Sequence, residues 1–338
     1  MRLRTETLDT KHLRVAVVGL GKMGLVHAGM LNVLPSVELV ALCEKSSLIR
    51  RFSKKLFKGL EIVDDLQKLS KFDLDAVFVT TPIPSHFPVA RAILEKKISS
   101  NLFVEKTLAQ NYEESRVLTD LAKSLQSVTM VGYLRRFYVT FNKAGELLLK
   151  DAIGKVDSFE AYAYSSDFLG IDKETNTAHS RGGVLRDLGC HAVDLALWFF
   201  ENLKVTFVEA KHADDCFGDS VSFRVENKEI TGQFDVSWCK EDYRMPEVGF
   251  LIAGSKGQLL VNDDQVKLDL KGSESARWYR HDLNDNVPFW LGLPEYYRED
   301  LSFVKSVVEG EKAEPDFCSA AKVDKIIEDV VGEEVQRD

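Results

Sequence analysis

Three glycines, Gly19, Gly21 and Gly24, have the spacing of a phosphate-binding turn. The first permits a tight turn, the second lets backbone N–H groups approach a pyrophosphate, and the third lets a helix pack closely on a strand. Glu44 lies twenty residues beyond Gly24, where a carboxylate can accept hydrogen bonds from ribose hydroxyls. The pattern predicts a dinucleotide site that favours NAD, since an acid repels a 2′-phosphate. The neighbouring Lys45 weakens this preference, so NADP is kept as an alternative cofactor.

A second group of residues could move a proton. Asp187, His191 and Asp194 fall at i, i+4 and i+7, so they would share one face of a helix. An unperturbed histidine titrates near ~6.5 and can take a hydroxyl proton and return it. His191 is therefore the candidate general base, with Asp187 holding it or binding a substrate hydroxyl. Lys106 ends an apolar stretch, where a cation can stabilise a developing alkoxide.

Strands and helices alternate over the first 133 residues, which predicts a parallel, doubly wound sheet of the Rossmann type. Ligands bind such sheets at the carboxyl ends of their strands. Thr80, Thr81, Pro82 and His86 follow one apolar run and become candidates for the site. The expected strands are 15–18, 37–43, 61–63, 75–80, 101–105 and 128–133, and the expected helices are 22–32, 46–57, 85–95 and 112–125.

From residue 138 the pattern of predicted elements changes to short strands with few helices between them. Such runs predict an antiparallel sheet, and hence an α+β second domain. We expect three parts: an N-terminal extension at 1–12, a dinucleotide-binding domain at 13–132, and a substrate-binding and oligomerisation domain at 133–338. The loop 170–181 is expected to border the substrate pocket. The second domain should contain helices at 138–149, 183–200, 294–310 and 319–331 and strands at 154–165, 205–210, 220–225, 230–237, 249–253, 257–261 and 266–270.

The composition narrows the class of protein further. The formal net charge of −9 argues against a nucleic-acid or anionic-membrane partner, although a local basic patch stays open. No apolar run is long enough to span a membrane, and residues 1–12 lack a signal core, so we expect a cytoplasmic protein. Five cysteines with no CxxC pair favour reduced thiols and give no metal site.

Together these stretches resemble the Gfo/Idh/MocA family of nucleotide-dependent oxidoreductases. The resemblance rests on the glycine turn, on Glu105-Lys106-Thr107 and on GGVLRDLGCHAVD at 182–194, with support from TPIPSH at 81–86 and GYLRRF at 132–137. It implies a Rossmann domain joined to an open antiparallel sheet, through which relatives associate as dimers or tetramers. It also implies that the lysine lies beside the nicotinamide, and it allows the roles of Lys106 and His191 to be exchanged.

One departure from the family pattern concerns Thr107, which stands where relatives usually have proline. Proline would constrain its neighbour, so threonine leaves the aim of Lys106 less determined. Arg135 and Arg136 are candidates for the cofactor or an acidic substrate, or equally for ion pairs at the domain boundary. The expected cofactor-binding residues are Gly19, Gly21, Lys22, Met23, Gly24, Glu44, Lys45, Thr80, Thr81, Pro82, His86, Glu105, Lys106 and Arg135.

The function expected from these residues is hydride transfer between NAD and a secondary hydroxyl of a sugar, cyclitol or related polyol. Two alternatives remain. The chain could reduce another C=O or C=N centre, or it could bind the cofactor as a sensor without turnover. Thr107, in place of the family's proline, is the reason to keep the sensor as an alternative. The presence together of Lys106, Asp187 and His191 favours an enzyme.

Overall fold

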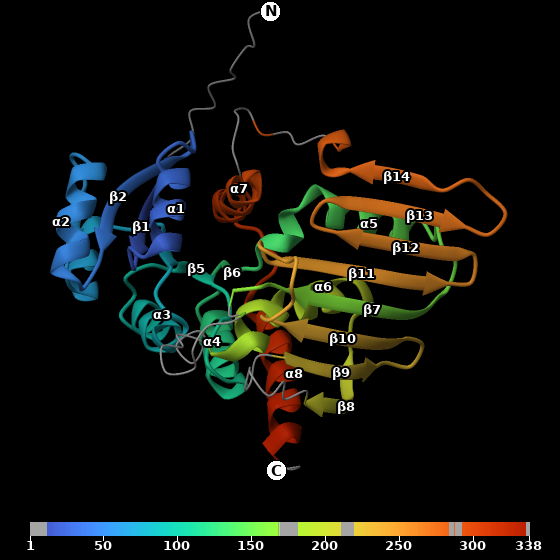
Figure 1. The fold of residues 1–338 in the computed structure, drawn as a ribbon. Helices are drawn as coiled ribbons and strands as arrows, with labels where there is room; N and C mark the ends of the chain where they lie inside the picture. Colours follow the sequence, from blue (N-terminus) through green and yellow to red (C-terminus); the bar gives the residue numbers. More distant parts are fainter. Residues whose placement is uncertain are drawn as a thin grey trace, which may run out of the picture.

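A computed structural model describes residues 12–167, 169, 182–210, 220–283, 287 and 293–335. These residues form two sheets that lie side by side, with helices between them (Figure 1). Most of the predicted N-terminal extension and the loop 170–181 lie outside the described residues.

The first sheet is parallel throughout and has the strand order β3-β2-β1-β4-β5-β6. Its central strands are buried on both faces because helices cover both, which explains their continuous apolar runs. The predicted doubly wound sheet is confirmed. Its elements are β1 (Leu13–Val18), α1 (Lys22–Leu31), β2 (Val37–Cys43), α2 (Ser47–Leu56), β3 (Glu61–Val63), β4 (Ala76–Val79), α3 (His86–Glu95), β5 (Asn101–Glu105), α4 (Tyr112–Ser124) and β6 (Thr129–Gly132).

The second sheet has the order β14-β13-β12-β11-β7-β10-β9-β8. Its neighbours are antiparallel except for β7 and β10, which run parallel, so the predicted antiparallel sheet is mixed at its centre. The strand β14 was not predicted. The elements are α5 (Val139–Leu149), β7 (Val156–Tyr164), α6 (Cys190–Phe200), β8 (Lys204–Ala210), β9 (Ser220–Glu226), β10 (Thr231–Ser237), β11 (Glu247–Gly254), β12 (Gly257–Asn262), β13 (Gln265–Leu270) and β14 (Ala276–Tyr279).

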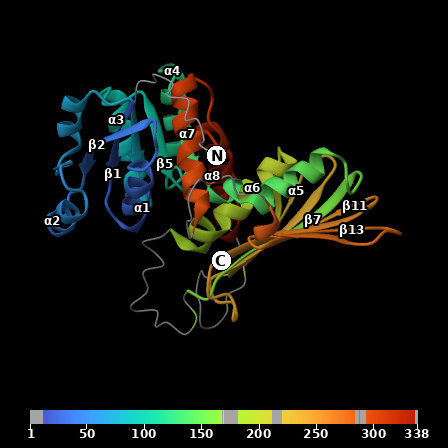
Figure 2. The same cartoon turned by 90° about the horizontal axis from the view of Figure 1, so that it is seen from above.

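Among the described residues, helices cover only one face of this second sheet. Figure 2 shows α5 and α6 on the same side, and no described helix lies on the opposite face. The strands alternate accordingly: Phe159, Ala161 and Ala163 of β7 are buried beneath the helices, and the residues between them point to the open face.

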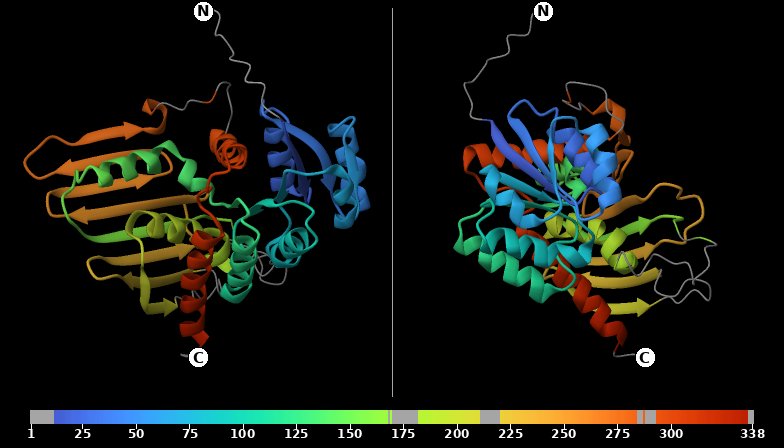
Figure 3. Two further views of the ribbon diagram at one scale, coloured as in Figure 1. Left: turned by 180° about the vertical axis from the view of Figure 1, so that it is seen from behind. Right: turned by 90° about the vertical axis from the view of Figure 1, so that its left-hand side faces the viewer.

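The last two helices tie the sheets together. The helix α7 (Pro294–Glu309) returns to the first sheet, where Tyr297, Phe303 and Val304 join the apolar core beside α1. The helix α8 (Phe317–Val335) packs against both α4 and α6 and is drawn in red in Figure 3. The first core is therefore completed by residues from the end of the chain.

No helix within the described ranges is long and apolar enough to cross a membrane. The cytoplasmic location stays a prediction. Cys43, Cys190 and Cys318 are free thiols, as expected. Cys239, which follows β10, is disulfide-bonded, so the expectation of reduced thiols is wrong at this position.

Candidate active site

A cavity of about 470 Å³ opens at the carboxyl ends of the first sheet. The glycine turn between β1 and α1 forms one wall, the end of β2 a second, and the segment after β4 a third. Nine expected cofactor-binding residues line it: Gly19, Gly21, Lys22, Met23, Glu44, Lys45, Thr80, Thr81 and Pro82.

The geometry of the turn fits a dinucleotide. A Cβ at Gly24 would lie 1.9 Å from the carbonyl oxygen of Gly19, so only glycine allows this helix to pack so closely. A Cβ at Gly21 would meet nothing within 4 Å, which leaves room beside the helix N-terminus for a phosphate. Glu44 is held in place, because its carboxylate accepts the N–H of Leu20 at 2.8 Å and that of Ser46 at 2.7 Å.

Four expected cofactor-binding residues besides Gly24 are absent from the wall of this cavity, namely His86, Glu105, Lys106 and Arg135. His86 is buried, and its two ring nitrogens lie 2.7 Å from the carbonyl oxygens of Thr81 and Thr107. Burial lowers its pKa although both carbonyls favour the charged ring. Glu105 is also buried, and Arg135 pairs with the second sheet at Asp263, 3.1 Å away. Their positions suit residues that hold the backbone rather than touch a ligand.

Lys106, the remaining member of the set, follows the carboxyl end of β5, next to β4 whose end borders the cavity. Its ammonium donates to the Asp187 carboxylate at 2.7 Å and also to the Asp187 backbone carbonyl. Its peptide bond to Thr107 is cis, and Thr107 is fully buried. Burial alone would lower the pKa of Lys106, but Cys190, Asp187 and Glu105 together raise it. The group is a cation, and its side chain is fixed by Asp187 despite the missing proline.

His191 lies at the start of α6, also buried, with its ring edge-on to Tyr133. Among the described residues, its Nδ1 atom has no hydrogen-bond partner. Burial first, then the charges of Arg135 and Lys106, lower its pKa well below 6.5. The ring is therefore neutral at pH 7, in contrast to the unperturbed histidine that the sequence suggested.

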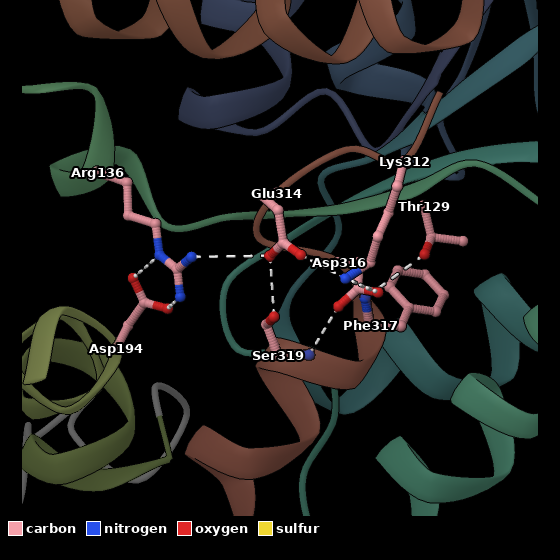
Figure 4. A network of polar contacts seen from close by, with 8 residues as sticks. All are labelled: Thr129, Arg136, Asp194, Lys312, Glu314, Asp316, Phe317 and Ser319. Atoms are coloured by element: carbon pink, nitrogen blue, oxygen red, sulfur yellow. Dashed lines mark hydrogen bonds and ion pairs between the residues drawn. The ribbon is translucent and has the colours of Figure 1, made fainter. Parts of the chain in front are cut away.

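Asp194 has a different partner from Asp187. Asp187 lies in a π-helix, Leu185–Gly189, and binds Lys106, whereas Asp194 lies on α6. Asp194 instead accepts two hydrogen bonds from Arg136, at 2.6 and 2.8 Å. Figure 4 shows this pair continuing through Glu314 towards Lys312 and Ser319, at the junction of the sheets. Arg136 fits the interpretation as an ion pair at the domain boundary.

A buried cluster behind Lys106 was missed at the sequence level. His27 of α1 lies 2.9 Å from Glu105 through Nε2 and 2.7 Å from Asp300 of α7 through Nδ1. The second carboxylate oxygen of Glu105 accepts the backbone N–H of Lys106 at 3.0 Å. Burial would lower the pKa of His27, but Asp300 and Glu105 raise it well above 6.5. The only sequence signal was a histidine three residues after Gly24.

Glu299 completes this cluster. It is fully buried, and neither of its carboxylate oxygens has a hydrogen-bond partner in the part of the chain that the structure describes. Burial raises its pKa well above the usual value. Ligand atoms of His27, Glu299 and Asp300 lie within 4.8 Å of one another. Both nitrogens of His27 already face carboxylates, so the cluster is arranged to hold protons around one imidazolium.

Comparisons with known proteins agree with this geometry. Residues 13–133 match the oxidoreductase family with an NAD-binding Rossmann fold, and residues 141–260 match the Gfo/Idh/MocA C-terminal domain. The chain belongs to the Gfo/Idh/MocA oxidoreductase family, and its first sheet is that family's NAD-binding domain.

Individual relatives are distant. A myo-inositol 2-dehydrogenase of Thermotoga maritima is 21% identical over 328 residues, covering 88% of this chain and 89% of the relative. An NAD-dependent scyllo-inositol 2-dehydrogenase of Bacillus subtilis is 28% identical, but the match covers only 54% of this chain and 53% of the relative. A levoglucosan dehydrogenase in complex with NADH and L-sorbose has a TM-score of 0.84 at 18% identity, covering 96% of this chain and 97% of that one.

Proposed function

We propose that this protein is an NAD-preferring dehydrogenase that acts on a secondary hydroxyl of a sugar, cyclitol or related polyol, or reduces the matching ketone. The observation that carries the proposal is the Lys106–Asp187 pair, 2.7 Å apart, with neutral His191 on the following helix. Lys106 follows β5, which pairs with β4, the strand whose end borders the dinucleotide cavity. The dehydrogenases of inositols and levoglucosan among the relatives support the substrate class.

The two pKa shifts favour one assignment of roles over its exchange. Lys106 stays protonated, so it suits a hydrogen-bond donor that stabilises negative charge on the substrate oxygen. His191 stays neutral, so it suits the group that accepts the hydroxyl proton. Asp187 orients the lysine. The bound nicotinamide would supply the hydride acceptor, and Glu44 would hold the adenosine ribose.

The acidic residue at the ribose end supports NAD over NADP. The carboxylate of Glu44 is fixed by two backbone N–H groups and borders the cavity, where it would repel a 2′-phosphate. We expect NAD to bind at least about tenfold more tightly than NADP, because an unpaired like charge opposes the phosphate.

The test is a screen of the purified protein with NAD and with NADP against cyclitols, sugars and sugar acids. The absorbance of reduced cofactor would be followed for the wild type and for Lys106→Ala. Turnover with NAD that collapses in the variant supports the proposal. Tight cofactor binding without turnover of any panel member would favour a cofactor-binding sensor. Turnover confined to imines or ketones without a polyol chain would favour a reductase that acts on another C=O or C=N centre.

We also propose that copies associate through the open face of the second sheet. A groove of about 420 Å³ crosses this face and is lined by Tyr162, Tyr164, Asp235 and Leu251 among others. An uncovered sheet of this size is a usual contact surface. In this proposal residues 13–132 bind the cofactor and residues 133–338 supply the substrate side and the contact. Sedimentation velocity distinguishes a dimer or tetramer from a monomer, which would overturn the association.

A further inference from the structure

The helix α2 has an outer surface that the dehydrogenase function does not use. Leu48, Phe52 and Leu56 stand one turn apart on it and are 68%, 53% and 55% exposed. Among the described residues, no other helix or strand carries more than one large apolar side chain exposed to this degree. Single exposed apolar residues are ordinary, but a contiguous stripe marks a contact surface.

Cations border this stripe. Between residues 45 and 58 the sequence has six lysines and arginines and no acidic residue, within a chain whose net charge is −9. Lys45, Arg51, Lys54, Lys55 and Lys58 are exposed. Arg51 and Lys55 lie three positions after Leu48 and Phe52, so they neighbour the stripe.

The charges of α2 differ from those of the other helices. At α3, α4, α5 and α8, at least one cation pairs with an acid three or four residues away, as in Arg91–Glu95 and Arg116–Glu113. On α2 no ion pair engages the five exposed cations within the described chain. Their charge is left for an external anion.

The position of α2 restricts what can cover it. Its inner side packs on the core through Ser53, which is fully buried, and the partly buried Ile49. Figures 1 and 2 both show α2 at the outer end of the first sheet, away from the second. The surface is a projecting helix rather than a groove. A flat anionic surface can meet it without shape complementarity, whereas a protein partner would need a matching groove.

We propose that α2 docks the protein on an anionic lipid bilayer. Leu48, Phe52 and Leu56 enter the headgroup region while the bordering cations pair with lipid phosphates, the arrangement of an interfacial amphipathic helix. The inference is independent of the proposed enzyme activity. Because Lys45 and Ile49 also line the dinucleotide cavity, the docked surface lies directly behind the adenosine end of that cavity.

The test is co-sedimentation of the full-length protein with vesicles of phosphatidylcholine alone and with roughly 30% phosphatidylglycerol. We expect binding only to the anionic vesicles, and we expect it to weaken strongly between about 0.1 M and about 0.5 M salt because the screening length becomes shorter. Binding to neither kind of vesicle overturns the proposal, as does equal binding to both, and an acidic protein would then be the better partner.

Two variants separate the contributions. Leu48→Ser/Phe52→Ser/Leu56→Ser should reduce vesicle binding by about tenfold or more, and Arg51→Gln/Lys55→Gln by about 30-fold. Leu149→Ser and Lys96→Gln/Lys123→Gln, which remove exposed groups elsewhere, are the matched controls and should bind as the wild type does. Thermal unfolding and NADH binding show that each variant is folded. Unchanged vesicle binding by either α2 variant contradicts the proposal.

Discussion

Two buried histidines have opposite electrostatic surroundings. His27 lies between Asp300 and Glu105, and these carboxylates raise its pKa well above 6.5 in spite of burial. His191 is buried too, but its charged neighbours are Arg135 and Lys106, so burial and charge both lower its pKa. The same residue type has a raised pKa that favours the cation in one place and a lowered pKa that favours the neutral base in the other. Neighbouring charge, and not burial, decides which.

Removing Lys106, a charged neighbour of His191, should have the largest effect on this contrast. Lys106→Met deletes the charge nearest the proposed reacting oxygen, and we expect kcat/KM to fall about 10³-fold, as for loss of an oxyanion donor. Because one of its two charged neighbours is gone, the pKa of His191 should rise. Steady-state kinetics and histidine NMR measure the two effects. A variant with full activity would remove Lys106 from the proposed mechanism.

Breaking the His27 cluster should affect stability. His27→Leu leaves two buried carboxylates without their cation, and we expect the free energy of unfolding to fall by about 3 kcal/mol. Urea denaturation at neutral pH measures it. His281→Leu is the matched control, since the His281 side chain is 81% exposed. Equal stability of the two variants would mean that Glu105 and Asp300 are neutral without His27.

Replacing the other histidine should affect catalysis more than stability. His191→Asn removes the proposed base, and we expect kcat to fall about 10²-fold, at the low end for loss of a general base. NADH affinity should be unchanged, because His191 does not border the dinucleotide cavity. A fall in NADH affinity as large as the fall in kcat would indicate a binding role instead.

The smallest effects are the pH dependences, and they have opposite signs. The folded state raises the pKa of His27, so its contribution is present below pH 6.5 and is lost as pH rises through the higher folded value. The folded state lowers the pKa of His191, so stability is lost as pH falls below 6.5.

Each slope is at most about 1.4 kcal/mol per pH unit. Urea denaturation from about pH 5 to about pH 8 should show the high-pH loss absent in His27→Leu and the low-pH loss absent in His191→Asn. Slopes of the same sign would contradict the contrast between the two rings.

Much of the first sheet could be predicted from the sequence, because its strands are apolar runs and its glycine turn is a local pattern. The segment 61–63 was predicted as a strand and is β3. The helical spacing of Asp187 and Asp194 does not reveal that the first binds Lys106 and the second Arg136, nor that Asp187 lies in a π-helix. The parallel pairing of β7 with β10 was not predicted, because the direction in which distant strands pair is a tertiary property.

The polar cluster was beyond sequence reasoning for a different reason. His27 and Asp300 are 273 positions apart, and no periodicity links them. Thr107 suggested a loosely aimed lysine, yet Asp187, 81 positions away, holds Lys106. Candidate residues were found by type and local pattern, whereas their partners depend on how the two sheets pack.

The return of α7 to the first sheet has a consequence for synthesis. Tyr297, Phe303, Val304 and Ala313 fill the same core as β1 and α1. While the ribosome is still making the second sheet, this core lacks a wall and His27 lacks Asp300. The nucleotide-binding half must therefore leave the exit tunnel with an open seam, which closes only after residue 313 has emerged. A nascent chain that ends before residue 294 should accordingly be more sensitive to protease in its first 130 residues than the finished protein.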